Sequence, residues 1–493
     1  MSVQLIRSKL DEVLRFLQPY MSFINCHMVD YITGSLWEVH VPQKIKDAIR
    51  DESDLEEAME AFWSREEFPE NQLALIEFIK ETEHHSLENF SEICEQGDLF
   101  KHLGTTCKDG ISIKEFMSEK KGHEVEIAAK LVHDLISVQE SGKEIYVVDA
   151  GDGKGYLSSR LALQYHFKVL GIDANEVNTE GAKKRSNKLE RAWNGLTQRA
   201  VLIKEGKVPP RRRKRITKEE LGSARGKSHS ANSANYKTIN EFIVPELDLA
   251  TMVRDHFNSA EGPEICLCGL HTCGNLAPTC LQLFYEQNAT KILFNIGCCY
   301  HLLNEEFLED DVFVNQEIAK RSPHHGFPMS AFLREKSFRL GRNARMLASQ
   351  SIHRTRTNKE LPNKSLFYRA LLEILIKENA PELGSSVQVG KIRKFESFEE
   401  YVEKCSRKFT NLSLNLLKSS EYNSLMERHS RDAKLLDLFY LIRMTFAPVI
   451  ETVILLDRLL FLKENQIDKS FIVPLFDPVI SPRRFAIVSF NVT

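Results

Sequence analysis

The stretch from Asp149 to Gly155 has the residue types and the spacing of a ligand-binding turn. It reads Asp-Ala-Gly-Asp-Gly-Lys-Gly and follows the apolar residues 146–148. Glycine adopts positive φ readily, and because it lacks a Cβ atom a ligand can lie directly against its backbone. We expect residues 156–165 to form the helix that leaves this turn and residues 169–172 to form the next strand, which ends at Asp173. The pattern therefore predicts a strand, a glycine turn, a helix and a second strand.

The spacing of the glycines favours one kind of cofactor over another. A dinucleotide fingerprint has the form G-x-G-x-x-G, whereas this turn has G-x-G-x-G with Asp149 two residues before its first glycine. The D-x-G-x-G form resembles the first motif of class I S-adenosylmethionine-dependent methyltransferases, in which the turn holds the methionine part of the cofactor and an acid after the second strand binds the ribose. The resemblance implies that the cofactor-binding residues are Asp149, Gly151, Gly153, Lys154, Gly155 and Asp173. The alternative is an ordinary surface loop.

Two polar clusters follow the predicted fourth and fifth strands. Residues 264–270 and 291–297 are near-continuous apolar runs, which are typical of parallel strands covered on both faces. Ligands of open α/β sheets bind beyond the carboxyl ends of the strands, so residues 271–276 and 298–301 are expected beside the cofactor. His271 could act as a general base, since its unperturbed pKa of about 6.5 suits that task. Asn275 or Tyr300 could hold a base or a sugar by hydrogen bonding and stacking.

The cysteines of these clusters could bind a metal, but their spacing argues against it. Cys273, Cys298, Cys299 and His301 offer the donor types that zinc prefers. Structural zinc sites usually show paired C-x2-4-C knuckles, and adjacent residues of a strand, such as Cys298 and Cys299, point to opposite faces. We therefore predict reduced thiols and no metal. A cysteine nucleophile is the weaker hypothesis, because methyl transfer from a sulfonium needs mainly alignment.

The helix before the first strand has two interpretations. Residues 117–125 lead into an amphipathic run over 127–136. If this helix packs beside the glycine turn, Lys121, His123 and Glu124 line the edge of the pocket. Otherwise they are the solvated start of a helix whose N-cap is Ser118.

A strongly basic segment follows the second strand. Residues 204–240 contain almost no large apolar side chain, and residues 204–227 hold ten basic residues against three acidic ones. Such a segment cannot bury a core, so we expect a disordered insertion. The run Arg211–Arg215 could contact RNA phosphates or act as a nuclear-import signal, or it could be a merely solvated loop.

Composition predicts an intracellular protein. The chain has 493 residues, 42% hydrophobic and 27% charged, with a net charge of −3, so the molecule as a whole does not attract nucleic acid or acidic lipid. Residues 1–20 contain several charged residues and do not have the pattern of a secretory leader. The ten cysteines do not form a disulfide framework, which indicates a reducing compartment, cytoplasmic or nuclear. The apolar run 441–462 holds four charged residues and is predicted to be a buried amphipathic helix rather than a membrane span.

The predicted architecture is an α/β fold with helical additions. Residues 1–117 are expected to form a helical N-terminal domain, 118–304 the cofactor-binding core, and 305–465 a helical insertion. Residues 466–493 are expected to supply two antiparallel strands that complete the sheet of the core. Oligomeric state is left open by the sequence.

From about residue 115 to the C-terminus, the chain resembles the methyltransferase-like protein 25 family, which is also labelled ribosomal RNA adenine dimethylase domain-containing. The motifs that carry the resemblance lie at 117–125, 149–155, 269–276 (Gly-Leu-His-Thr-Cys-Gly-Asn-Leu), 297–301 (Gly-Cys-Cys-Tyr-His), 326–330 and 481–483. The H-x-C-G and C-C-x-H elements are also similar to those of Trm-thirteen-type transfer-RNA 2′-O-methyltransferases.

This resemblance implies an S-adenosylmethionine-dependent methyltransferase that acts on RNA, either ribosomal or transfer RNA, at a ribose hydroxyl or a base. His271, Cys273, Asn275 and Tyr300 are the residues expected near the acceptor. Two other functions stay open, namely a catalytically inactive adaptor that keeps the fold, and a methyltransferase of protein or small molecules.

Overall fold

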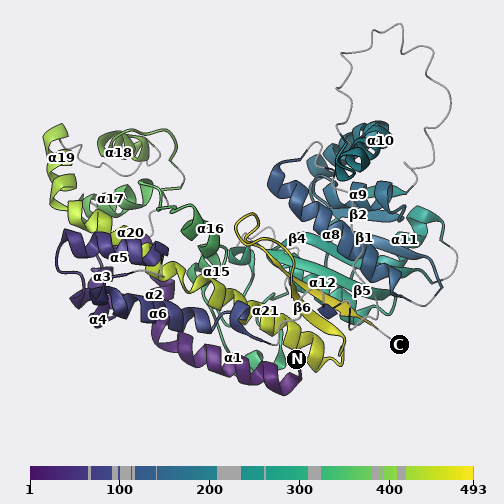
Figure 1. Cartoon of the computed structure of the whole chain (residues 1–493), viewed down its shortest axis with the longest axis horizontal. Coiled ribbons are helices and arrows are strands. Elements are labelled where there is room, and N and C mark those ends of the chain that lie inside the picture. Colours follow the sequence, from purple (N-terminus) through teal and green to yellow (C-terminus); the bar gives the residue numbers. More distant parts are fainter. Residues whose placement is uncertain are drawn as a thin grey trace, which may run out of the picture. The chain divides into compact units, whose positions relative to one another are not determined.

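The computed structural model describes residues 1–491 except 65–67, 92–97, 100, 102–112, 114–116, 140–141, 208–234, 260–261, 309–323, 380–388, 391 and 408–417 (Figure 1). The chain divides into two compact units. Unit 1 consists of Met1–Leu10, Ser91–Arg339 and Ile454–Thr493, and unit 2 of Asp11–Phe90 and Leu340–Val453. Helices α1 (Val3–Leu17) and α21 (Ala447–Glu464) have residues in both units.

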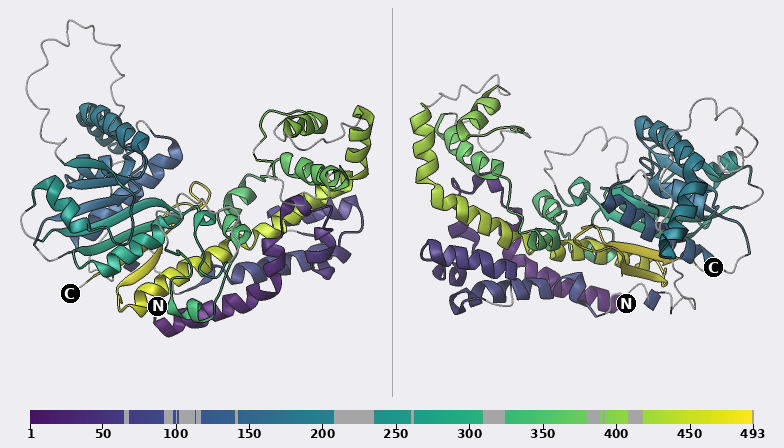
Figure 2. Two further views of the ribbon diagram at one scale, coloured as in Figure 1. Left: turned by 180° about the vertical axis from the view of Figure 1, so that it is seen from behind. Right: turned by 45° about the horizontal axis from the view of Figure 1, so that its top comes forward.

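A seven-stranded sheet forms the centre of unit 1, in the order β3-β2-β1-β4-β5-β7-β6 (Figure 2). Its strands are β1 (Ile145–Ala150), β2 (Val169–Asp173), β3 (Tyr236–Asn240), β4 (Glu264–Cys273), β5 (Thr290–Cys298), β6 (Ser470–Pro474) and β7 (Phe485–Phe490). The first five strands run parallel, whereas β7 is antiparallel to both of its neighbours, β5 and β6. The predicted α/β fold with antiparallel final strands is confirmed.

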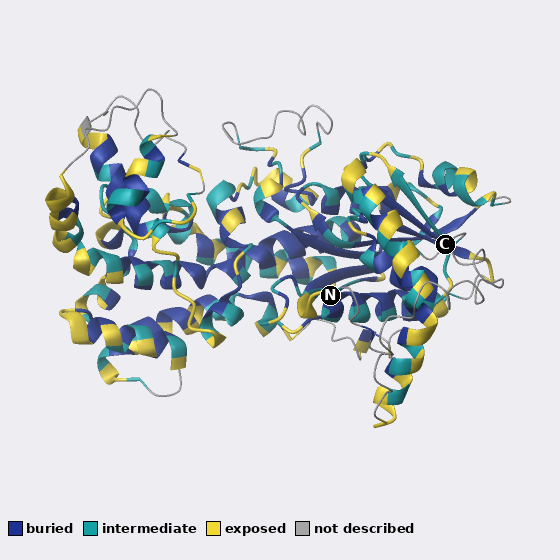
Figure 3. Cartoon of the chain, turned by 90° about the horizontal axis from the view of Figure 1, so that it is seen from above, coloured by how far each residue is buried: buried dark blue, intermediate teal, exposed yellow. Residues whose placement is uncertain are grey.

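Helices cover the sheet because its strands are apolar on both faces. All six residues of β1 are buried, as expected for the centre of a parallel sheet, and Figure 3 shows the central strands mostly in dark blue. The helices of this unit are α8 (Glu119–Ser137), α9 (Tyr156–Gln164), α10 (Glu176–Lys204), α11 (Leu249–Phe257), α12 (Leu276–Glu286), η5 (Tyr300–Leu302) and α14 (Ala331–Glu335). Side chains of α8 and α9 pack against Val147, Cys268 and Phe294 in one core cluster, and α12 packs on β4 and β5.

Several elements of unit 1 differ in extent from their predictions. Strands β4 and β5 continue to Cys273 and Cys298, so part of each polar cluster belongs to the sheet. Strand β3 lies at Tyr236–Asn240, within the range 204–240 that the sequence predicted to be a disordered insertion, so the prediction was wrong at this end. Helix α10 continues to Lys204, the first residue of that range. Most of the predicted basic insertion, including Arg211–Arg215, lies outside the described residues.

Unit 2 is helical and is built from two distant parts of the chain. Its helices are η1 (Gln18–Tyr20), α2 (Met21–Asn25), η2 (Met28–Asp30), α3 (Leu36–His40), α4 (Gln43–Asp47), α5 (Glu52–Ser64), η3 (Glu70–Gln72), α6 (Leu73–His84), η4 (Leu87–Asn89), α15 (Arg342–Leu347), α16 (Ile352–Thr357), α17 (Ser365–Asn379), α18 (Phe398–Ser406), α19 (Ser419–Arg428) and α20 (Ser430–Met444). The predicted domain boundaries, 1–117 and 305–465, assigned these helices to two separate domains. The two-unit division instead groups 11–90 with 340–453.

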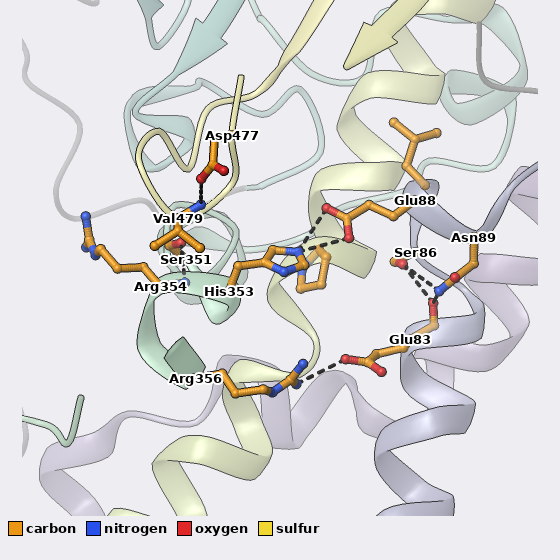
Figure 4. Close-up of polar contacts among 12 residues, drawn as sticks. Glu83, Ser86, Glu88, Asn89, Ser351, His353, Arg354, Arg356, Asp477 and Val479 are labelled. Carbon is orange, nitrogen blue, oxygen red and sulfur yellow. Dashed lines mark hydrogen bonds and ion pairs between the residues drawn. The ribbon is translucent and has the colours of Figure 1, made fainter. Parts of the chain in front are cut away.

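Buried polar contacts join the two parts of unit 2. Arg443 donates from Nε and Nη2 to the carbonyl oxygen of Ile24, at 3.1 and 2.5 Å. Residues of α16 also reach the first part, as Figure 4 shows. Arg356 pairs with Glu83 at 3.1 Å and His353 with Glu88 at 2.9 Å. These contacts connect residues more than 250 positions apart in the sequence.

The apolar run near the end of unit 2 is a buried helical segment. Ser430–Glu464 is long and apolar enough to span a membrane by composition alone, and 89% of its most apolar window is buried within the protein. The predicted single helix is in fact α20 and α21, separated by residues 445–446. Because α21 is buried on nearly all sides, it is a core helix rather than an amphipathic one.

Candidate active site

The glycine turn between β1 and α9 has the backbone conformation that its sequence predicts. Gly151, Gly153 and Gly155 have φ values of 76°, 60° and 67°, a region that other residues rarely adopt. At Gly155 a Cβ atom would also lie 2.5 Å from the hydroxyl of Tyr236. The turn is fixed to the next strand by the amide of Gly151, which donates to the carbonyl oxygen of Ile172 at 2.9 Å.

Asp173, at the carboxyl end of β2, faces this turn. Its Oδ2 accepts from the backbone amide of Gly153 at 2.9 Å. Its Oδ1 accepts from the amide of Asn175 at 2.8 Å and from Nδ2 of Asn178 at 3.2 Å. The side chain is half-buried, and Lys154 is exposed at the tip of the turn. An oriented carboxylate and bare backbone therefore lie together at the carboxyl ends of β1 and β2.

Asp149, by contrast, points into the core beneath the turn. It is 2% exposed, and its Oδ2 accepts from the hydroxyl of Ser158 at 2.8 Å. Ser158 also lies 2.7 Å from Asp152, which accepts a second hydrogen bond from Tyr236 Oη. The hydroxyl proton of Ser158 can be donated to only one carboxyl group at a time. A proton on one of the two acids supplies the second hydrogen bond. Asp149 thus supports the turn from below.

Burial raises the pKa values of both acids, which favours a proton on one of them. Burial, followed by the negative charge of Asp152, raises the pKa of Asp149 well above its usual range. Burial likewise raises the pKa of Asp152 to about 6, although hydrogen bonds from Tyr236 and Ser158 act in the opposite direction. Burial therefore favours one proton held by the pair Asp149 and Asp152.

At the end of β4, His271 is paired with a carboxylate that has no exposed surface. His271 Nε2 lies 2.9 Å from Glu124 Oε2, and Lys121 Nζ lies 2.9 Å from the same oxygen. The other oxygen, Oε1, accepts from the hydroxyl of Ser481 at 2.7 Å. Burial by itself would raise the pKa of Glu124, but His271 and then Lys121 hold it at about 2. Glu124 is therefore ionised at neutral pH.

An ionised Glu124 fixes the protonation of His271. A carboxylate only accepts hydrogen bonds, so the imidazole must carry its proton on Nε2. In the neutral ring Nδ1 then keeps a lone pair. The side chain of His271 is 23% exposed, so this arrangement produces a partly accessible base whose partner stabilises the charged form.

Both interpretations of the start of α8 hold in part. Ser118 is the N-cap and accepts from the amide of Lys121 at 3.3 Å. Glu124 nevertheless contacts His271 and Lys121 pairs with Glu124, whereas His123 Nε2 lies 3.4 Å from the amide of Asp477. The first turn is thus solvated on one side and lines the end of β4 on the other.

Three cysteines meet at the ends of β4 and β5. Cys273 Sγ lies 3.1 Å from Cys298 Sγ and 3.4 Å from Cys299 Sγ, and the last two are 3.7 Å apart. Cys273 is exposed, Cys299 half-buried and Cys298 buried. Hydrogen bonds from Cys273 and Cys298, and then the charges of His301 and His271, lower the pKa of the Cys299 thiol to about 2.

Asn275 and Tyr300 are used to hold the protein together. Asn275 Nδ2 donates to the carbonyl oxygen of His324 at 3.0 Å, and its Oδ1 accepts from the amide of Asn304 at 2.9 Å. The ring of Tyr300 is 1% exposed and lies between Arg458 and Arg483, whose Cζ atoms are 5.7 and 5.4 Å from its centroid. The stacking role predicted for Tyr300 therefore needs a correction, because a ring buried between two guanidinium groups presents no face to a base.

Sequence reasoning assigned no role to three residues that shape the site. They are Ser158 and Tyr236, which hold the buried acids, and Arg458, which lies against Gly297 and Tyr300. A serine one turn into a mostly apolar helix was the only local signal for Ser158. Tyr236 and Arg458 reach the site from β3 and α21, so only the assembled sheet reveals them.

Comparison with known proteins agrees with this geometry. A family model described as a methyltransferase domain matches residues 120–306, a range that contains the glycine turn, His271 and the three cysteines. Together with the strand order, this match defines an α/β methyltransferase domain.

The chain belongs to the methyltransferase-like protein 25 family. A relative from Homo sapiens, described as probable methyltransferase-like protein 25, is 30% identical, and the match covers 98% of this chain and 97% of the relative. The corresponding protein from Mus musculus is 29% identical over 98% of this chain and 96% of its own length. The resemblance deduced from the motifs is confirmed.

Proposed function

We propose that this methyltransferase uses S-adenosylmethionine to methylate RNA, with a ribose hydroxyl as the acceptor. The observation that carries the proposal is the pairing of His271 with buried Glu124 at the same sheet edge as the glycine turn. A hydroxyl is a poor nucleophile until its proton is removed, and a histidine held by a carboxylate is suited to remove it.

The residues of the turn fit the cofactor. Three glycines with positive φ expose backbone without side chains, and Asp173 presents a carboxylate already oriented by three donors. Such a carboxylate suits a pair of ribose hydroxyls, since it accepts hydrogen bonds on both oxygens. When bound, S-adenosylmethionine supplies a methyl group activated by a sulfonium.

The protein's own part in the reaction is to move a proton. His271 Nδ1 accepts the proton of the acceptor hydroxyl, while Nε2–H keeps its hydrogen bond to Glu124. The carboxylate stabilises the imidazolium that forms, and Lys121 and Ser481 keep the carboxylate in place. The pair thus contributes a base of fixed tautomer.

The basic helix α10 supports RNA as the substrate class. It carries seven basic and three acidic residues. Its N-cap is Asn175, whose backbone amide donates to Asp173. Its exposed cations are Lys183, Lys184, Lys188, Arg191 and Lys204. A row of cations on one helix attracts phosphates despite the net charge of −3 of the whole chain.

Calorimetric titration with S-adenosylmethionine tests the cofactor. Loss of the Asp173 carboxylate in Asp173→Ala should weaken binding about 10- to 100-fold, since hydrogen bonds to a charged group contribute about 1.5–3 kcal/mol. Asp255→Ala, on the exposed surface of α11, is the matched control and should bind like the wild type. A wild-type protein that binds no S-adenosylmethionine would be an adaptor.

The acceptor is tested by mass spectrometry of nucleosides from RNA of cells that lack the protein. We expect a 2′-O-methylated nucleoside to disappear, to return with the wild type, and to stay absent with His271→Ala, because general-base catalysis contributes about 10²- to 10⁴-fold. Loss of a base-methylated nucleoside instead would show that the ribose assignment is wrong. Unchanged RNA nucleosides would point to a protein or a small molecule.

A further inference from the structure

The three thiols at the ends of β4 and β5 form a more compact group than their sequence spacing suggests. In the described part of the chain, Cys273, Cys298 and Cys299 are the one set of three or more His, Cys, Asp or Glu residues whose ligand atoms all lie within 4.8 Å of one another. From the sequence, a metal site was considered unfavourable because adjacent residues of a strand point to opposite faces. The ends of β4 and β5 both depart from regular strand geometry, so this reason no longer applies.

On β4 a bulge brings the first cysteine into place. The register between β4 and β5 shifts between Leu270 and Thr272, where His271 has φ of 73°. Because the bulge inserts one extra residue, Cys273 becomes the partner of Cys298. Without it, Thr272 would occupy that position.

On β5 the strand ends just before the third cysteine. Cys298 is the last residue of the strand, and Cys299 has φ of 50° and ψ of 48°, which is the left-handed region. This conformation redirects the Cys299 side chain, so that its sulfur lies 3.4 Å from Cys273 instead of on the opposite face. Left-handed residues other than glycine are uncommon and concentrate at functional sites.

We propose that Cys273, Cys298 and Cys299 bind a divalent thiophilic metal ion, with zinc as the representative ion, at the acceptor edge of the sheet. Tetrahedral zinc with Zn–S bonds of about 2.3 Å requires sulfurs about 3.8 Å apart. The observed separations of 3.1, 3.4 and 3.7 Å are close to this value, so binding needs only a small outward movement of the sulfurs.

The chemistry of the group selects the class of ion. Thiolates favour zinc and other soft ions over magnesium and calcium, which take oxygen ligands. Binding releases to solvent the protons that the thiols still carry as the three metal–sulfur bonds form. Three protein ligands leave a fourth position open, as in catalytic zinc sites.

Such a site would connect the two strand ends that carry the acceptor-side residues. His271 lies two positions before Cys273, so a metal bridging β4 and β5 would hold the bulge that orients the imidazole. This inference does not depend on S-adenosylmethionine or RNA, since the metal can be measured without either.

The first test is the metal content of the full-length protein, purified after growth with added zinc and measured by inductively coupled plasma mass spectrometry. We expect about one zinc per chain in the wild type and at least a tenfold lower content in the triple variant with serine at positions 273, 298 and 299. Cys26→Ser, which alters a half-buried thiol of unit 2, is the control and should keep its zinc. Wild-type protein without stoichiometric metal would overturn the proposal.

Cobalt gives a readout that does not depend on the stability of a variant. Protein stripped by a chelator and titrated with Co²⁺ should develop sulfur-to-cobalt charge-transfer absorption, about one third weaker in Cys299→Ser, since one of three thiolates is lost. Absence of this absorption in wild-type protein, with a Cys273–Cys298 disulfide found by non-reducing peptide mapping, would replace the metal with a redox pair. S-adenosylmethionine titrations of the same samples keep the two proposals separable.

Discussion

Glu124 is a charge that the fold keeps ionised in a place without solvent. Its side chain has 0% exposure, and four partners, His271, Lys120, Lys121 and Ser481, replace the water that it lost on folding. Burial of a lone carboxylate would be strongly unfavourable, so the stability of this site depends on the complete set of donors.

We predict that Glu124→Gln destabilises the protein by about 2 kcal/mol at pH 7, because a neutral amide loses its charge-assisted hydrogen bonds. The folded-state pKa of Glu124 is about 2, below an unfolded value of about 4.3. Its contribution is therefore complete above about pH 5 and disappears as the pH falls toward 2. The difference between variant and wild type should shrink over that window.

Thermal unfolding midpoints between pH 3 and pH 8 measure this difference. Glu119→Gln, at an exposed position in the first turn of the same helix, should differ little from the wild type at any pH. A difference for Glu124→Gln that does not change with pH would mean that its carboxylate is not the titrating group.

At the scale of residues, the sequence could predict the conformation of the glycine turn better than the surroundings of the residues that follow β4 and β5. The conformation of Gly151, Gly153 and Gly155 is a local property, and Asp173 follows a strand that its own residues define. Tyr300 was different, because its environment consists of arginines from α21 and from the loop before β7. No neighbouring residue in the sequence signals that burial.

Among the elements, α21 is notable for anchoring a loop through one acid. Asp457 is fully buried and accepts from the amides of Met329 and Ser330, at 2.8 and 2.9 Å, and from the hydroxyl of Ser330 at 2.6 Å. The loop 326–330 precedes α14, and Gly326 lies against Asn275. One side chain thus fixes a segment that touches the end of β4.

Asp457→Ala should destabilise unit 1 by about 3 kcal/mol, because two buried amides and a hydroxyl lose their acceptor. Hydrogen exchange followed by mass spectrometry should show faster exchange at 326–335. Asp457→Asn keeps one acceptor oxygen and should lie between the wild type and the alanine variant. Equal protection of this loop in all three proteins would contradict the anchoring role.

The strands and the helices differ in how far their sequences define them. Strands β1, β4 and β5 could be predicted because each is a short apolar run, although the ends of β4 and β5 at Cys273 and Cys298 could not. Those ends depend on the bulge at His271, which is a property of the pairing of two strands. The helix predicted over 441–462 instead includes the end of α20 and most of α21, which are separated by residues 445–446.

On the scale of the whole molecule, the core cluster of the sheet consists of residues of unit 1. In unit 2, polar contacts join its two parts. The sequence predicted helices in both parts but not their association, because that association is made by long-range contacts such as Arg443 with Ile24.

We predict that Arg443→Ala destabilises unit 2. The affinity for the proposed cofactor S-adenosylmethionine, measured at about 15 °C, should stay within twofold of the wild-type affinity. The substitution leaves the carbonyl oxygen of Ile24 without its two donors, at a cost of about 1–3 kcal/mol. Hydrogen exchange should rise at residues 21–25 and not at 149–155. Arg428→Ala, which is exposed on α19, serves as the control, and a loss of affinity as large as that of Asp173→Ala would refute the independence of the cofactor site.

The position of β7 between β5 and β6 has a consequence for biosynthesis. Strand β5 ends at Cys298, but the partner that covers its outer edge begins only at Phe485, after all the intervening helices have been translated. Until then the nascent chain displays unpaired amides and carbonyls along a hydrophobic strand, which is a template for aggregation. A premature stop codon between the end of β5 and the start of β7 would therefore yield an insoluble product, even though every residue of the glycine turn and of the His271–Glu124 pair is already present.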